Sequence, residues 1–288
     1  MPQLTWNRYG KARVRLVKVR RPSTRRGSAS RGDENRHELV DLTVDVQLEG
    51  AFEDVYRNGD NRTCLPTDTM KNTIYAFAKQ DPIRHVESFA LRLAEHFGTR
   101  PGVTRARISA FEERWERIAA GGRPHPHAFS RPGQEQWTTV VTREGAGSEV
   151  WSGLTNLVVL KTADSGFSGF PRDRYTTLQD TDDRILATAV TAAWRYRRGT
   201  RDFGARTRIR QRIIETFAEH DSRSVQHTLY AMAEAALDAC DEVSEVTVTL
   251  PNRHHLRVDL SPFGLENANE IFVATDEPYG VIEATVKR

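Results

Sequence analysis

Apolar and polar residues alternate along residues 38–49, where Val40, Leu42, Val44, Val46 and Leu48 fall on one side and polar residues on the other. A period of two predicts a strand with one buried face. Residues 9–20 have a similar strand-like pattern. The stretch 21–37, rich in Arg, Ser and Gly, predicts a long hairpin tip between these two strands.

Two helices are expected next along the chain. Thr67, Asp68 and Thr69 are residue types that cap a helix start, with a carboxylate in the first turn. The second helix is predicted by apolar residues at helical spacing: Ile83, Val86, Ala90, Leu93, Ala94 and Phe97. Strands are then expected at about 103–117 and 136–143. The Gly-, Pro- and His-rich segment between them, which contains His125 and His127, is expected to be a loop.

The second half of the chain repeats this order of elements. Strands are expected at about 150–161 and 184–197, and a helix near 206–219. A further helix has its apolar stripe at Val225, Leu229, Met232, Ala233, Ala236, Leu237 and Cys240. Three strands follow, at about 243–250, 253–260 and 270–274.

Short strings also repeat between the halves. TIYAFAKQD at 73–81 aligns with IIETFAEHD at 213–221, with matches such as Ile74/Ile214 at a distance of 214 − 74 = 140 positions. In the next helix the matches lie 139 apart, as in Val86/Val225. The repeat predicts two tandem ββααββ units, residues 1–145 and 146–288, of the α+β class, with antiparallel sheets and helices on one face. Closing several sheets into a barrel by oligomerisation would protect their uncovered faces and edges.

Charge and composition narrow the possible partners. Lys plus Arg number 42 and Asp plus Glu number 39, which gives a formal net charge of +3. Acidic residues alternate with Arg in most segments, whereas nucleic-acid binding favours clustered basic residues. No stretch approaches the ~20 apolar residues of a membrane span. We therefore expect neither a nucleic acid nor a membrane as partner, and an Arg-rich nucleic-acid-binding protein is kept only as an alternative of another class.

Motifs for a metal or a nucleotide cofactor are missing from the sequence. His125-Pro-His127 has no carboxylates at ligand spacing, and there is no HExxH pair. GxGxxG, Walker A and GxSxG strings are also absent. Two cysteines without CxxC spacing, Cys64 and Cys240, argue against a disulfide framework and a cysteine-ligated metal.

Several polar residues are candidates for a site. Strand alternation would align Lys11 with Arg13 and Arg15, and neighbouring cations would disfavour its protonated form, so that Lys11 is either a base or a solvated lysine. Thr67 and Asp68 either cap a helix or bind an anion or an oxygen species there.

The second half offers groups suited to a flat ring. Ser224, Val225 and Gln226 begin a helix, and the Gln amide with nearby N–H groups could contact the edge of a heterocycle. Asn252 and His254 are expected to share a strand face. Arg184 could bind an acceptor edge in a bidentate manner. Phe167 either stacks on a ligand or packs within its Gly-rich loop.

Eight strings in order from residue 9 towards the C-terminus resemble the urate oxidases (uricases). They include Tyr9-Gly-Lys11, Leu65–Tyr75, His125–Phe129 and Leu157–Lys161. The remaining strings are Phe167–Leu178, Asp183–Leu186, Ser224-Val-Gln226 and Leu250–His254. Each string is short, but their order along nearly the whole chain is specific.

The resemblance implies the tunnelling fold (T-fold), in which two ββααββ units per chain assemble as a homotetramer around a tunnel. It implies oxidation of urate by O2 to 5-hydroxyisourate and hydrogen peroxide, with O2 as co-substrate and with no metal or organic cofactor. Four active sites would lie at subunit interfaces. Another tunnelling-fold enzyme, acting on a pterin or purine, is the alternative, and those relatives usually bring a metal.

The resemblance also implies roles for particular residues. One chain would supply Lys11, Thr67 and Asp68, and its neighbour would supply the residues that bind the ring: Phe167, Leu178, Arg184, Val225, Gln226, Asn252 and His254. Lys11, Thr67 and His254 would form a proton relay. Thr67 and Asn252 would hold O2, and then peroxide or water, above the ring.

The compartment is predicted from the two ends of the chain. The first residues lack the apolar core of a signal peptide. The last four, Thr-Val-Lys-Arg, differ from a peroxisomal Ser-Lys-Leu ending. We expect a cytoplasmic protein, and the excess of Arg over Lys fits a bacterium with a GC-rich genome.

Overall fold

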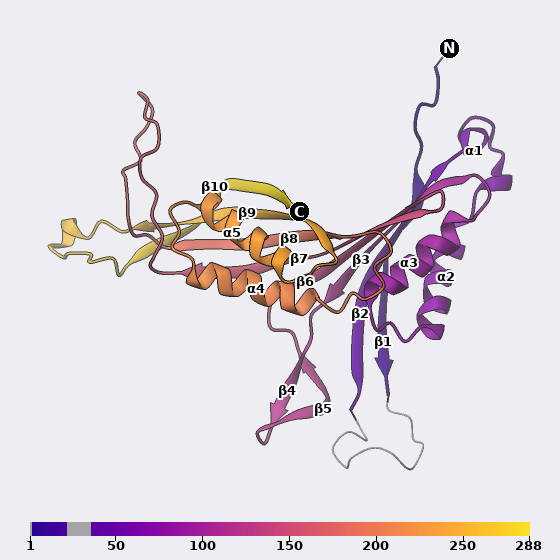
Figure 1. Cartoon of the computed structure of the whole chain (residues 1–288), viewed down its shortest axis with the longest axis horizontal. Helices are drawn as coiled ribbons and strands as arrows, with labels where there is room; N and C mark the ends of the chain where they lie inside the picture. The colour runs from indigo at the N-terminus through magenta and orange to yellow at the C-terminus, as the bar shows by residue number, and fades with distance from the viewer. Residues whose placement is uncertain (1, 22–35) are drawn as a thin grey trace. The chain divides into compact units, whose positions relative to one another are not determined.

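The computed structural model describes residues 2–21 and 36–288, so most of the predicted hairpin tip at 21–37 lies outside the described residues (Figure 1). Two compact units divide the chain. Unit 1 comprises Met1–Gly153 and Arg198–Gly204, and unit 2 comprises Leu154–Arg197 and Ala205–Arg288. Among the described helices, none is long and apolar enough to cross a membrane.

Unit 1 contains a sheet in the order β1-β2-β3-β6 with antiparallel neighbours. Its strands are β1 (Tyr9–Arg20), β2 (Glu38–Gly50), β3 (Val103–Glu113) and β6 (Gln136–Glu144), and β7 (Gly147–Lys161) begins in this unit. Its helices are α1 (Glu53–Asn58), η1 (Asn61–Thr63), α2 (Thr67–Gln80) and α3 (Val86–Gly98). Helix α2 packs against β1, and α3 packs against β3 and β6.

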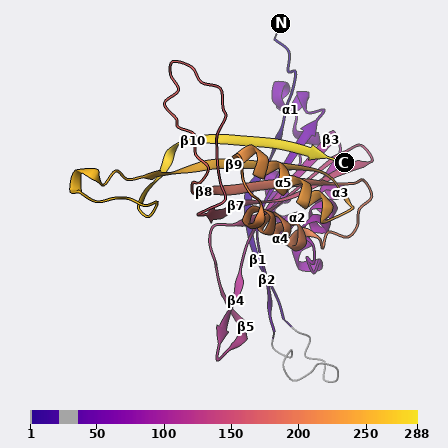
Figure 2. The same ribbon diagram turned by 60° about the vertical axis from the view of Figure 1, so that its left-hand side comes forward.

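Unit 2 repeats this arrangement with strands in the order β7-β8-β9-β10. Its strands are β8 (Leu186–Tyr196), β9 (Val243–Arg257) and β10 (Phe272–Lys287), and its helices are α4 (Arg206–Glu219), α5 (Val225–Asp238) and the short η2 (Ser261–Phe263). Helix α5 packs on β9 and β10 (Figure 2). Two ββααββ units of the α+β class are therefore confirmed.

The alternation in the sequence explains which face each strand buries. Val44, Val46 and Leu48 of β2 have no exposed surface, as have Phe89 and Leu93 of α3. In unit 2 the corresponding core contains alternate residues of β8 and β9: Val190, Trp194, Val246, Val248 and Leu250. Burial of such side chains stabilises each unit by ~1.5–3 kcal/mol per residue.

The helix repeat corrects one of the sequence alignments. Helices α2 and α4 begin 206 − 67 = 139 positions apart, and α3 and α5 begin 225 − 86 = 139 apart. The buried residues of α2 and α4 are also 139 apart: Met70/Ile209, Ile74/Ile213 and Ala78/Phe217. The string alignment at 140 positions in the first helix pair was therefore wrong by one position. Residues of the same type align at 140 positions, whereas the residues that the two helices bury align at 139.

Two further predictions differ from the structure, a loop around His125 and His127 and a strand break near Pro251. The expected loop around His125 and His127 is a two-stranded ribbon of β4 (Glu116–Ala120) and β5 (Arg123–Ser130), closed by the turn at Gly121 and Gly122 (Figure 1). The predicted break near Pro251 is absent, and β9 runs through it. Proline removes one ladder donor, and β9 pairs with β8 at Thr249 and Asn252 but not at the two residues between them, one of which is Pro251.

The last strand is longer than predicted. Residues 272–287 form β10, whereas the sequence suggested only a short strand at about 270–274. Pro278 and Gly280 interrupt the strand-like pattern of apolar residues, so the sequence predicted a strand that ends too early. Helix α1 was also not expected.

Candidate functional site

Unit 1 holds the start of α2 against the start of β1. The Leu65 amide donates to the Tyr9 hydroxyl over 2.9 Å, and the Tyr9 ring meets Phe52 edge-on at 5.0 Å. Burial, with Cys64 alongside, raises the pKa of Tyr9 to about 12. The phenol therefore stays protonated at neutral pH and fixes the segment that leads into Thr67.

The start of α2 leaves backbone donors available. The residue before the helix is Pro66, and its side chain makes no capping hydrogen bond. The predicted cap at Thr67 is therefore wrong by one position. Thr67 is the first helical residue and is half-buried, while Asp68 is exposed. The first N–H groups of a helix have no partner within the helix, and they favour an oxygen or anion.

A bulge in β1 corrects the prediction for Lys11. The register shifts between Lys11 and Val14, where Arg13 adopts a φ of 56°. Lys11 pairs with Val46 and Val14 with Val44, so both lie on the face that α2 covers, whereas Arg15 pairs with Thr43 on the other face. Lys11 is therefore not aligned with Arg13 and Arg15, and its neighbouring charges differ from those expected.

The nearby charges belong to α2. Asp68 forms an ion pair with Lys71 and accepts from the Asn72 amide over 2.9 Å. Lys71 chiefly, with a smaller contribution from Lys11, holds the pKa of Asp68 below its usual value. Lys11 and Asp68 are thus close enough to interact electrostatically, and the structure brings Lys11, Thr67 and Asp68 together in unit 1.

In unit 2, a network of backbone hydrogen bonds joins three separate segments. The Phe167 and Thr181 backbones exchange bonds of 2.7 and 3.0 Å, and the Arg184 amide donates to Ser165 over 2.8 Å. The Gly166 amide donates to the carbonyl of Ser222, which lies just before α5. This network fixes Phe167 and Arg184 near the N-terminus of α5.

Arg184 and Phe167 form a cation–aromatic pair. The guanidinium carbon lies 5.3 Å from the centre of the Phe167 ring, and Phe170 stacks on Phe167 at 4.9 Å. The Arg184 Nε atom is buried and has no hydrogen-bond partner among the described residues. Burial also lowers the pKa of Arg184. A half-buried cation beside an aromatic ring favours a flat, anionic or electron-rich ligand.

Helix α5 presents its own start to this region. Ser224 caps it by accepting from the His227 amide over 3.1 Å, so the predicted cap is confirmed here. Val225 is buried, and the Gln226 side chain is exposed. The 14 residues of α5 span about 21 Å, which a strand covers in about six residues. After the short turn to β9, the start of α5 therefore lies near Leu250 and Asn252.

Asn252 and His254 occupy alternate positions of β9 and share a face, as predicted. Asn252 pairs with Thr188 in β8 and with Gly280 in β10, and His254 pairs with Thr275.

Leu178 lies on the segment between Phe167 and Arg184. It is exposed, and its carbonyl accepts from Arg172 over 3.0 Å.

The His-Pro-His string has a structural setting. His125 and His127 have ring centres 4.5 Å apart, and the carbonyls of His125 and Pro126 accept from Arg117. Within residues 2–21 and 36–288, no group of three or more His, Cys, Asp or Glu is arranged to hold a metal ion.

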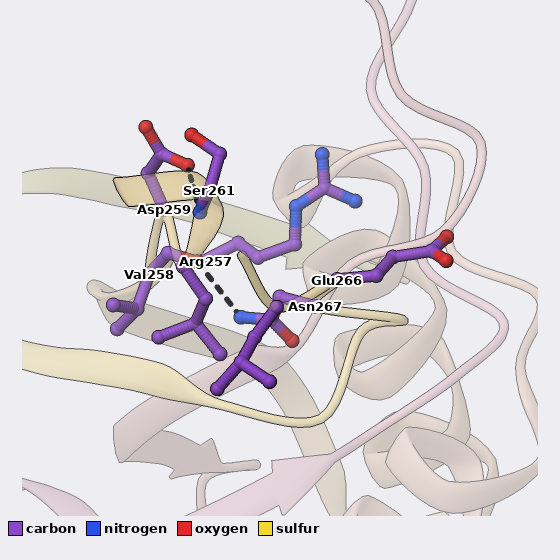
Figure 3. Close-up of a pocket in the computed structure, with 8 residues that line it drawn as sticks. Arg257, Val258, Asp259, Ser261, Glu266 and Asn267 are labelled. Carbon is purple, nitrogen blue, oxygen red and sulfur yellow. Dashed lines mark hydrogen bonds between the residues drawn. The ribbon is translucent and has the colours of Figure 1, made fainter. Parts of the chain in front are cut away.

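A pocket of about 450 Å³ lies in the connection between β9 and β10, and its lining residues, which begin at Arg257, include none of the predicted site residues (Figure 3). Asn267 closes this connection by donating to Val258 and Ile271, over 2.9 and 2.7 Å. The side-chain amide of Asn267 therefore stabilises the connection between β9 and β10.

Sequence reasoning missed two residues that support the site. Tyr9 was noted only as part of a string. Thr188 stands in a row of buried apolar residues of β8, and its polarity in that row is the signal that could have identified it. Together, the two units define an α+β scaffold with a lysine beside a helix start in one unit and a half-buried arginine–aromatic pair in the other.

Comparison with known proteins agrees with this description. The family model described as Uricase matches residues 7–142 and 150–283. A curated uricase from Arthrobacter globiformis is 46% identical over 98% of this chain and 89% of its own length. Another, from Aspergillus flavus, is 38% identical over 98% and 95%.

Solved structures give the same result. The crystal structure of uricase from Arthrobacter globiformis aligns with a TM-score of 0.90 at 45% identity, and it covers 100% of this chain and 96% of that chain. A uricase from Bacillus fastidious shares the fold, with a TM-score of 0.81 at 24% identity over 98% and 93%. The chain belongs to the uricase family.

Proposed function

We propose that this protein is a urate oxidase, which converts urate, O2 and water to 5-hydroxyisourate and hydrogen peroxide. The observation that carries this proposal is the match to the uricase family across both units, at up to 46% identity with a curated uricase. The half-buried Arg184–Phe167 pair supports it, because urate is flat and is an anion at neutral pH.

The ring-binding residues come from unit 2 in this proposal. Arg184 donates two hydrogen bonds to one edge of urate, and its unpartnered Nε provides one of the donors. Gln226 offers a donor and an acceptor to the other edge, and the Val225 N–H at the start of α5 favours the anion. Phe167 stacks on the ring, with Leu178 closing its side.

The reacting groups are divided between the units. Lys11, Thr67 and His254 relay the proton that urate loses, which makes the ring electron-rich enough to reduce O2. Asp68 contributes its backbone at the start of α2. Thr67 and Asn252 hold O2 above the ring, and later peroxide or water. The electrons pass directly from urate to O2, so this mechanism needs no metal or organic cofactor.

The assembly we propose is a homotetramer in which unit 1 of one chain meets unit 2 of its neighbour at each site. Apolar side chains remain exposed on strands of unit 2, such as Val158 and Leu160 on β7 and Val281 on β10. Exposed apolar surface of this kind marks an interaction surface. We place the assembly in the cytoplasm of a bacterium.

The test follows urate absorbance, O2 and peroxide together, in buffer containing EDTA, with the metal content of the protein measured separately. We expect urate loss to match O2 uptake and peroxide release, at a rate that does not depend on metal content. Absence of urate loss from the folded protein would overturn the proposal. Binding of a pterin or dependence on a metal would then favour the alternative tunnelling-fold enzyme.

A further inference from the structure

Thr188 is a polar residue in an apolar row. It has no exposed surface, and it lies between Leu186 and Val190, which face the same core of unit 2. Its Oγ1 atom is buried and has no hydrogen-bond partner among the described residues. A buried hydroxyl without a partner costs ~1–3 kcal/mol, whereas a valine of similar shape would avoid this cost.

The strand register places this hydroxyl beside Asn252. Thr188 in β8 pairs directly with Asn252 in β9, two strands that lie side by side in the sheet of unit 2 (Figure 1). Directly paired residues point to the same face, with Cβ atoms ~4.5–5.5 Å apart. This face is the buried one, because Val248 and Leu250 of β9 share it with Asn252.

Two other buried polar atoms without a partner belong to the segment that precedes β8 or to a residue that bonds to it. Arg184 Nε and Ser165 Oγ are also buried without a hydrogen-bond partner among the described residues. The Arg184 amide binds the Ser165 carbonyl, and Arg184 lies four residues before Thr188. Buried polar groups without a partner are expected at functional sites rather than in a core selected for stability alone.

We propose that Thr188 is a positioning residue for Asn252. When O2 binds, this unpartnered hydroxyl turns to donate to Asn252 Oδ1, which directs the Nδ2 donors toward O2 and the peroxide that forms from it. Since negative charge develops on the oxygen atoms as urate is oxidised, amide N–H donors stabilise it and an amide oxygen would repel it. This inference rests on the proposed urate oxidase function, and it adds the group that sets the orientation of the carboxamide.

The test compares Thr188→Val and Thr188→Ala, which lack the hydroxyl, with Thr188→Ser, which keeps it. We expect Thr188→Val to lower kcat/KM for O2 at saturating urate by ~10-fold. Urate binding without O2 should stay within ~2-fold of the unmodified protein, because Thr188 does not contact the ring. Thr188→Ser should restore most of the O2 reactivity relative to Thr188→Ala, and this pair differs only in the hydroxyl.

Two further variants make the test specific. Thr191→Val is the matched control, because Thr191 pairs with Thr249 on the opposite face of the same two strands, and it should leave O2 reactivity unchanged. In an Asn252→Ala background, Thr188→Val should have little additional effect, since the residue it positions is gone.

The outcomes separate this inference from the proposed function. Full O2 reactivity in Thr188→Val, or equal losses in the Ser and Ala variants, would overturn the positioning role while urate oxidation stands. If the losses from Thr188→Val and Asn252→Ala multiplied in the double variant, the positioning role would also be overturned. Should the unmodified protein fail to oxidise urate, the proposed function itself fails.

Discussion

The two helix starts that carry candidate site residues, those of α2 in unit 1 and α5 in unit 2, belong to different positions of the repeat and differ in chemistry. Helix α2 begins at Thr67 behind Pro66 and has no side-chain cap, and Lys11 and Asp68 place charges beside it. Helix α5 begins behind Ser224, which caps it, and next to it lie a half-buried arginine and an aromatic ring. One helix start is open and charged, and the other is capped and close to a cation.

This difference underlies the division of roles between the two units in the proposed function. The scaffold repeats at 139 positions in its helices, and the buried residues of α2 and α4 follow the same period. The site residues do not repeat at this period: Val150 stands 139 positions after Lys11, and Asp45 stands 139 positions before Arg184. Packing constrains the core positions of both units, whereas site chemistry is free to differ.

The largest expected effect removes the cation of unit 2. Arg184→Ala should reduce kcat/KM for urate by ~1000-fold, mostly through KM, because two charge-assisted hydrogen bonds are lost. Steady-state kinetics with varied urate would measure it. Arg172→Ala, which removes a guanidinium that contacts the Leu178 carbonyl and Phe170, is the comparison variant and should have a much smaller effect. A KM like that of the unmodified protein would contradict the binding role of Arg184.

The next effect removes the amine of unit 1. Lys11→Met should reduce kcat by ~100-fold while urate binding stays nearly unchanged, because the lost group moves a proton. Turnover and anaerobic urate binding should be measured on the same preparation. Lys18→Met, which loses a contact with the Ala78 carbonyl on the same strand, serves as control. Unchanged turnover in Lys11→Met would exclude the relay.

The capping difference predicts a smaller effect, on stability. Ser224→Ala should lower the free energy of unfolding by about 1 kcal/mol, since the His227 amide loses its acceptor. Denaturant titration would measure it. Ser261→Ala is the control, because that serine is exposed and sits at a three-residue 3-10 helix. Equal stability of Ser224→Ala and the unmodified protein would show that the cap contributes nothing to α5.

The smallest effect concerns pH. Burial, then His227 and Lys161, lower the pKa of His220 below its usual 6.5, so the folded protein resists a proton that the unfolded chain accepts. Stability from this group is therefore complete above pH 6.5 and decreases as the pH falls below that value. His220→Gln should make unfolding free energy depend less on pH in the acid range, as measured by melts across pH.

A matched change in unit 1 sharpens this comparison. Burial, then Arg100, lower the pKa of His96 in the same direction. His96→Gln should therefore flatten the same acid range, and the double variant should combine both effects. An unchanged pH dependence in both single variants would mean that neither histidine is protected from protons in the folded state.

Much of the fold was predictable because periodicity depends on local sequence. Strands β1 and β2 and helix α4 were predicted to within one residue, since their apolar stripes are regular, and cap chemistry placed the start of α2 equally well. The ribbon at His125 and the full length of β10 were not, because Pro and Gly break the pattern there while backbone pairing continues. Pairing partners distant in sequence decide such cases.

The sequence by itself determined the two-unit plan, the α+β class and the residue types of the site, because these follow from periodicity and from short strings. Only the tertiary structure decided their surroundings. The bulge at Arg13 turns Lys11 toward α2, and the strand register places Thr188 beside Asn252. A shift of one residue reverses the face of every side chain in a strand, and alternation alone does not show where such a shift occurs.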